Sequence, residues 1–77
     1  MRPMIKAQRM LMKAPSIRNY GGSPLLVVIG DIVYSYNTPV AAYIDGSLYV
    51  PKWYSTTTTR HINSIAVEWN CEVIKGY

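Results

Sequence analysis

Short apolar segments follow one another between residues 25 and 50, and residues that favour turns separate them. Residues 25–29 form an uninterrupted apolar run that is long enough for a buried strand. The segments 32–36, 40–44 and 47–50 are also rich in residues that favour strands. Because side chains alternate along a strand, Ile32, Tyr34 and Tyr36 are predicted on one face and Val33 and Ser35 on the other. The pattern therefore predicts four strands.

Three breaks connect these strands. Gly30-Asp31 has the length of a two-residue hairpin connection, and Asp45-Gly46 predicts a type I′ turn. The segment 37–39 is expected to interrupt the ladder, because Pro39 has no N–H to donate. Since short connections join antiparallel neighbours, we predict a four-stranded antiparallel meander with one face packed and the other partly exposed to water.

Helical spacing of apolar residues begins after these strands. The positions in residues 57–69 that form an apolar stripe are Ile62, Ile65, Ala66 and Trp69. The stripe outweighs the low helix propensity of the threonines, and Ser55 or Thr56 can cap the helix start. Residues 71–74 are compatible with a short closing strand. The predicted fold class is α+β, a small antiparallel meander of about four strands packed against one helix.

A second helix is predicted at the N-terminus, over residues 2–14, between Pro3 and Pro15. At about 100° per residue one side of this helix is basic and the opposite side is apolar. The basic side consists of Arg2, Lys6, Arg9 and Lys13, and the apolar side of Met4, Ala7, Leu11 and Ala14. An isolated helix of this length is marginal in water, so we expect it to dock on its own domain or on a partner. Residues 16–24 have the composition of a linker, which divides the chain into a basic N-terminal helix or arm (1–20) and one small α+β domain (21–77).

The net charge of +4 is concentrated at the N-terminus. Arg18 joins the four basic residues of the predicted helix, whereas the first acidic residue is Asp31. The single cysteine, Cys71, excludes an internal disulfide, and together with His61 it provides too few ligands for zinc. The longest apolar run is far shorter than the ~20 residues that span a bilayer, and the basic N-terminus does not match a signal peptide. We expect a cytoplasmic protein without cofactor or membrane contact.

Two stretches resemble a known domain: SYNTPVA at residues 35–41 and YSTTTTRHIN at residues 54–63. Their order and spacing are similar to a small domain of bacteriophages and related prokaryotic elements, with the pattern SYxTPVA, a hairpin, and YSxTTxxHIN. The resemblance covers residues 27–65, implies a phage or mobile-element origin and an α+β fold, and brings no catalytic residues with it. It also implies that the expected cytoplasm is that of the infected or host cell. In physical terms, Val40 and Ala41 are small enough for a helix to lie close to the sheet, and His61 and Asn63 are expected to hydrogen-bond helix to sheet.

The sequence contains little that predicts catalysis. His61 is the single histidine, and no nearby carboxylate completes a nucleophilic site with Ser55 or the threonines. We therefore predict that the protein is not an enzyme. The start of the second predicted helix offers free N–H groups, hydroxyls and positive charge, which makes it a candidate anion site. Its residues are Thr57, Thr58, Arg60 and His61.

Aromatic residues are the second candidate binding feature. The chain has seven tyrosines and two tryptophans but no phenylalanine. Amphipathic rings suit protein interfaces, base stacking and half-buried packing alike. The candidates on or beside the predicted sheet are Tyr34, Tyr36, Tyr43, Tyr49, Trp53 and Tyr54.

Three classes of function remain open from the sequence. The leading hypothesis is a phage-type accessory protein that binds and modulates a host or phage protein through the tyrosine-rich face and the basic helix. The second is a nucleic-acid-binding protein whose basic helix neutralises phosphates. The third is a virion or structural component, and a homo-oligomer is compatible with each of them.

Overall fold

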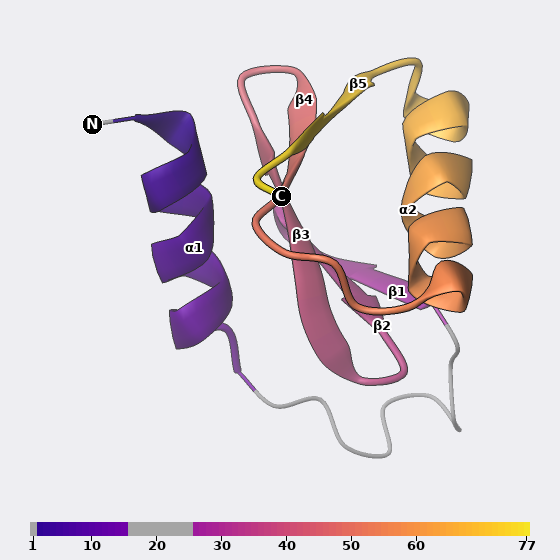
Figure 1. Ribbon diagram of the computed structural model, residues 1–77, viewed down its shortest axis with the longest axis horizontal. Coiled ribbons are helices and arrows are strands. Elements are labelled where there is room, and N and C mark those ends of the chain that lie inside the picture. Colours follow the sequence, from indigo (N-terminus) through magenta and orange to yellow (C-terminus); the bar gives the residue numbers. More distant parts are fainter. Residues whose placement is uncertain (1, 16–25) are drawn as a thin grey trace.

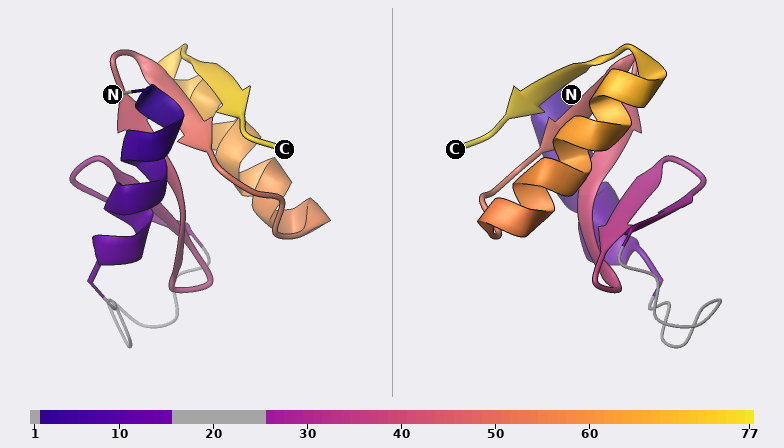
Figure 2. Two further views of the ribbon diagram at one scale, coloured as in Figure 1. Left: turned by 60° about the vertical axis from the view of Figure 1, so that its left-hand side comes forward. Right: turned by 90° about the vertical axis from the view of Figure 1, so that its right-hand side faces the viewer.

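The computed structural model describes residues 2–15 and 26–77, which form three layers with a β-sheet between two α-helices (Figure 1). Helix α1 covers one face of the sheet and helix α2 covers the other, as the turned views also show (Figure 2). In chain order the elements are α1 (Pro3–Lys13), β1 (Leu26–Ile29), β2 (Ile32–Ser35), β3 (Thr38–Ile44), β4 (Ser47–Val50), α2 (Thr56–Trp69) and β5 (Glu72–Lys75).

The sheet has the strand order β1-β2-β3-β4-β5 within the described residues. Strands β1 to β4 pair antiparallel, which confirms the predicted meander. The short closing strand suggested at residues 71–74 is present as β5. It is a fifth strand and runs parallel to β4, so the prediction of an antiparallel sheet of about four strands is incomplete. This direction follows from α2, which carries the chain back along the sheet before β5 begins.

Turn conformations explain two of the strand connections. Asp45 and Gly46 both have positive φ, 49° and 83°. Positive φ at both central residues is the mark of a type I′ turn, so this prediction is confirmed. Gly30 has φ 60° at the first position of the Gly30-Asp31 connection, a conformation that glycine adopts without steric cost.

The connection between β2 and β3 differs from the prediction. Tyr36 and Asn37 form the turn, with φ values of 53° and 65°, and the predicted strand 32–36 therefore ends at Ser35. Strand β3 begins at Thr38 and includes Pro39, so the expected interruption of the ladder at residues 37–39 is wrong. The left-handed conformation of two consecutive residues reverses the chain before the proline is reached.

A β-bulge explains how β3 accommodates the proline. Tyr34 pairs with Pro39 and Val33 pairs with Ala41, which leaves Val40 as an extra residue. A bulge disrupts the ladder locally and is one of the few places in a sheet where a missing N–H costs little. The bulge also interrupts the alternation, so Val40 and Ala41 both belong to the core beneath α2.

Each face of the sheet contributes to a separate core. The larger core, between the sheet and α2, contains Val33, Val40, Ala41, Leu48, Val50, Ile62, Ile65 and Ala66. The smaller core, between the sheet and α1, contains Ala7, Leu11, Ala42 and Ile44. The prediction of a partly wet face is therefore wrong where α1 docks. Strand β3 is apolar on both sides, as strands with two covered faces are.

Helix α2 begins and ends with side-chain and backbone caps. Of the two candidate caps, Ser55 is the one used: its Oγ accepts a hydrogen bond from the Thr58 N–H at 3.1 Å. Asn70 ends the helix in the left-handed conformation, with its N–H directed to the carbonyls of the last turn. Trp69, predicted on the buried stripe, is partly exposed and packs edge-on against Tyr43, with ring centroids 5.3 Å apart.

Part of the predicted domain organisation is not described by the structure. The predicted linker at residues 16–24 and the basic residue Arg18 lie outside the described residues. The division into residues 1–20 and 21–77 therefore stays a prediction. Within the described residues, α1 is in contact with β3 and β4.

Candidate functional site

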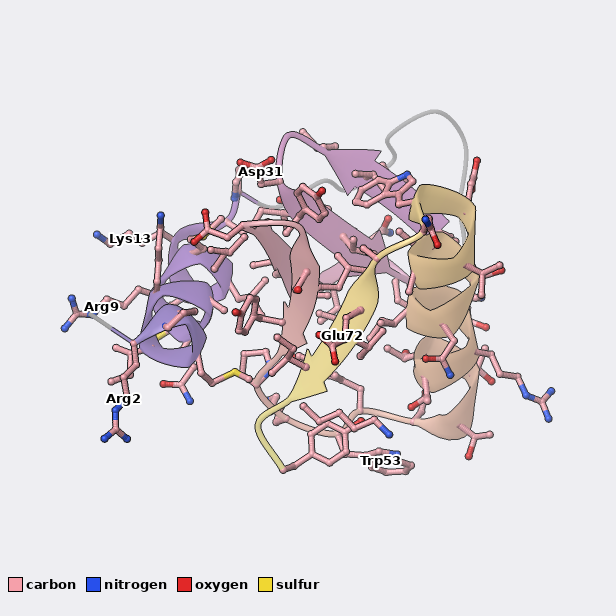
Figure 3. All side chains as sticks on the ribbon, turned by 90° about the horizontal axis from the view of Figure 1, so that it is seen from above. Arg2, Arg9, Lys13, Asp31, Trp53 and Glu72 are labelled. Carbon is pink, nitrogen blue, oxygen red and sulfur yellow. The ribbon has the colours of Figure 1, made fainter. Side chains whose placement is uncertain are left out.

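The basic residues of α1 share one exposed face, which we call the basic face. Figure 3 shows Arg2, Arg9 and Lys13 projecting from α1 away from the sheet. Lys6 is also exposed and lies between them in the helical spacing. The four charges therefore form one row along the outer side of α1, as the sequence predicted. The basic face consists of Arg2, Lys6, Arg9 and Lys13.

The opposite side of α1 fixes the direction of the basic face. Ala7 and Leu11 are buried against Ala42 and Ile44 of β3. The small side chains of Ala7 and Ala42 allow the helix to lie close to the sheet. Because the apolar contact sets the rotation of the helix about its axis, the basic face is directed away from the sheet.

Helix capping does not explain the basic residue at the start of α1. Arg2 is the N-cap residue, and its guanidinium has only donors, so it cannot accept a hydrogen bond from the N–H groups of the first turn. The first turn also lacks acidic residues. A cation near a helix N-terminus is unfavourable by a few tenths of a kcal/mol up to about 1 kcal/mol, because the free N–H groups are the positive end of the helix dipole. Lys13, in the last turn, has the favourable position.

A buried polar cluster joins the two stretches that resemble the phage domain. The Ser35 Oγ lies 3.1 Å from the Thr58 Oγ1 and 2.9 Å from the His61 Nδ1. Ser35 is only 2% exposed and Thr58 only 5%. The ring of Tyr36 lies beside that of His61, with centroids 5.6 Å apart. These contacts connect the end of β2 to the first two turns of α2.

This cluster confirms part of the structural interpretation of the motif. His61 does link α2 to the sheet, through Ser35. Asn63 does not: it is exposed, so its predicted hydrogen bond to the sheet is wrong. The sequence analysis missed the role of Ser35 and predicted only that it shares a face with Val33. With so little exposure, and with Thr58 beside it, the Ser35 hydroxyl is part of the packing between helix and sheet.

The candidate anion residues at the start of α2 divide into two pairs. Thr58 and His61 direct their polar atoms to Ser35, and the Thr58 N–H is taken by the Ser55 cap. Thr57 and Arg60 are exposed. The structure therefore brings Thr58 and His61 together around Ser35, and it does not gather all four residues around one point.

The six candidate aromatic residues lie in different environments. Tyr34 is buried, and its hydroxyl donates a hydrogen bond to the Pro15 carbonyl at 2.9 Å. Tyr43 packs with the core beneath α2, whereas Tyr49 packs with the core beneath α1. The half-buried Tyr54 donates to the Pro39 carbonyl at 3.4 Å. Of these six residues, only Tyr36 and Trp53 have exposed rings.

Burial changes the acidity of two of these tyrosines. Desolvation raises the pKa of Tyr34 above its ordinary value, because the phenolate form would lose contact with water. The same cause raises the pKa of Tyr54. Both groups stay neutral hydrogen-bond donors at neutral pH.

Other kinds of site are not found among residues 2–15 and 26–77. These residues enclose no pocket, and they hold no group of three or more His, Cys, Asp or Glu side chains that could bind a metal ion. Neither described helix has the length and apolar character needed to cross a membrane. Within the described residues, the candidate binding sites are therefore exposed surfaces rather than pockets or metal sites.

The fold and these surfaces define a small α+β domain in which a mixed sheet between two helices presents a basic helix face. Residues 1–74 match a family of unknown function, DUF8033, and the chain belongs to this family. The matched region includes α1 as well as the sheet and α2. Searches of curated proteins and of solved structures found no match.

Proposed function

We propose that this protein is a small accessory protein that binds, and thereby modulates, a host or phage macromolecule without catalysing a reaction. The partner presents negative charge to the basic face of α1. The phage context is supported by the resemblance of residues 35–41 and 54–63 to a phage-encoded domain.

One observation carries the proposal: four cationic side chains lie in a row on the outer side of a helix whose inner side is held against the sheet. A charged row on a docked helix is preorganised, so binding requires less ordering of the protein than a disordered basic arm would. The charge of Arg2 at the helix N-terminus further supports a role in binding, because that position disfavours a cation for helix stability.

The salt dependence of binding tests this proposal. If all four basic residues contact phosphates, log K falls with log[salt] with a slope of about −2.8 for a single strand to about −3.6 for a duplex. Affinity is then expected to fall about 50- to 150-fold between about 50 and 200 mM salt. The assay is a titration of labelled heparin, single-stranded DNA, duplex DNA and polyglutamate with the protein at several salt concentrations.

Charge-neutralising variants identify the surface. The variant Arg2→Gln/Lys6→Gln/Lys13→Gln removes three charges of the basic face and retains Arg9. We expect its salt slope to drop by about 2 or more in magnitude. The matched control compares Lys6→Gln with Arg60→Gln, because each removes one positive charge from an exposed helix residue, on α1 or on α2. Equal losses in these two single variants, or unchanged binding by the triple variant, would overturn the proposal.

A further inference from the structure

A second group of cations and aromatic rings lies where the C-terminal segment meets the loop between β4 and α2. The pairing of Val50 with Lys75 continues through a hydrogen bond from the Gly76 N–H to the Val50 carbonyl, at 2.8 Å. This contact holds the residues that follow β5 beside those that follow β4. We call the group the C-terminal patch; it consists of Lys52, Trp53, Tyr54, Lys75 and Tyr77.

The patch combines positive charge with exposed rings. The Lys52 Nζ lies 5.2 Å from the centroid of the Tyr54 ring, and the Lys75 Nζ lies 5.8 Å from that of Tyr77. Trp53 is 57% exposed and Tyr77 is 53% exposed. Figure 3 shows Trp53 at the periphery of the molecule, pointing away from the sheet. The exposed indole of Trp53, which follows Lys52 directly in the chain, offers a stacking surface close to positive charge.

The C-terminal patch adjoins the start of α1. A Cβ atom at Gly76 would lie 3.1 Å from the Met4 Sδ and 2.8 Å from the Pro51 carbonyl oxygen, so the chain passes closely between these two residues. The first turn of α1 is therefore a neighbour of the C-terminal segment. Figure 3 shows Arg2 and Trp53 along the lower edge of the view, Arg2 at the left beside α1 and Trp53 toward the right.

We propose that the basic face and the C-terminal patch together form a binding surface for single-stranded nucleic acid. This inference rests on the proposed function and names the partner class. The basic face and the two lysines contact phosphates, and Trp53 stacks on an unpaired base. The combination favours a single strand over other acidic partners, because only a single strand offers both spaced phosphates and free base faces. In a duplex the bases are stacked on each other, and an acidic protein has no bases.

The test uses oligo(dT) of about 10 nucleotides, within the range of site sizes of small single-strand-binding domains. Trp69→Phe leaves Trp53 as the sole tryptophan, and we expect oligo(dT) to quench its fluorescence. Trp53→Ala is expected to weaken oligo(dT) binding by about 5- to 150-fold, the range for losing one base–aromatic stack. Trp53→Phe keeps a stacking ring and should retain most of the affinity.

Heparin and duplex DNA separate this inference from the proposed function. Heparin carries charge without bases, so Trp53→Ala should leave heparin binding unchanged, whereas Arg2→Gln/Lys6→Gln/Lys13→Gln should weaken the binding of both ligands. The single-strand inference is overturned if Trp53→Ala binds oligo(dT) as tightly as the original protein. It is also overturned if duplex DNA or polyglutamate binds as tightly as oligo(dT). Neither result overturns the basic face as a binding surface. If the triple variant binds heparin and oligo(dT) undiminished, the proposed function itself fails.

Discussion

The buried cluster around Ser35 predicts a large loss of stability from the removal of one oxygen atom. Ser35→Ala takes away the partner of two polar groups, the Thr58 Oγ1 and the His61 Nδ1. Thr58 is almost completely buried, so water cannot replace the lost hydrogen bond without disturbing the core. The His61 ring is half-buried and can regain a water molecule.

The magnitude follows from this difference in burial. A buried polar group left without a partner costs about 1–3 kcal/mol, whereas a group that regains water costs little. We therefore expect Ser35→Ala to lower the free energy of unfolding by about 2 kcal/mol. For a domain of this size, that is a decrease in Tm of about 8–16 °C. Such a change is a large fraction of the stability of a small domain.

A double-mutant cycle tests the physical cause. Thr58→Val removes the second hydroxyl but leaves Ser35 bonded to His61, so it should cost less than Ser35→Ala. Once Thr58 has no hydroxyl, Ser35→Ala no longer leaves that buried group unpaired, and the double variant should cost about 1 kcal/mol less than the sum of the single variants. Urea unfolding followed by circular dichroism gives the free energies.

The control is Ser64→Ala, an exposed serine of α2, which should change the stability by no more than about 0.5 kcal/mol. The reasoning is refuted if Ser35→Ala matches this control. It is also refuted if the effects of Ser35→Ala and Thr58→Val are additive, since the cost would then come from packing alone.

Two further predictions concern α1 and the buried tyrosine. Leu11→Ala should lower the free energy of unfolding by about 2–3 kcal/mol, because Leu11 is one of two buried residues that hold α1 on the sheet. The control Met12→Ala, at an 85% exposed neighbour, should change it by less than about 0.5 kcal/mol. Equal thermal unfolding curves for the two variants would contradict the docking of α1. For Tyr34, the folded state holds the phenolic proton more tightly than the unfolded state, so stability is retained below the ordinary pKa of about 10 and declines as the pH rises through the raised pKa. Tyr34→Phe loses the hydrogen bond to Pro15 at every pH, but its Tm should decline less between about pH 9 and 11 than that of the original protein. Parallel profiles of Tm against pH for Tyr34→Phe and the original protein would show that the titration of Tyr34 is not the cause.

The features that the sequence predicted correctly depend on neighbouring residues. The Asp45-Gly46 turn, the Ser55 cap and the basic row on α1 follow from local backbone preferences and helical periodicity, which act over a few residues. The strand segments follow from the same kind of local pattern. Such features are decided before distant parts of the chain meet, and the sequence alone therefore predicts them.

The features that the sequence missed depend on residues far apart in the chain. The predicted break at residues 37–39 failed because a bulge opposite Val33 and Tyr34 accommodates Pro39 within β3. A bulge is a property of two paired strands, and the alternation within one of them does not reveal it.

The tertiary structure decided which helix covers each face of the sheet and which distant side chains meet. By itself the sequence determined most of the helices and strands, the Asp45-Gly46 turn and the position of the charge on one side of α1. Only the folded chain decided that α1 docks on the second face, that Ser35 meets His61 across 26 residues, and that the C-terminal segment comes to lie beside Pro51. The physical reason is that periodicity specifies which side of an element is apolar, whereas its partner depends on the long-range packing of the whole chain.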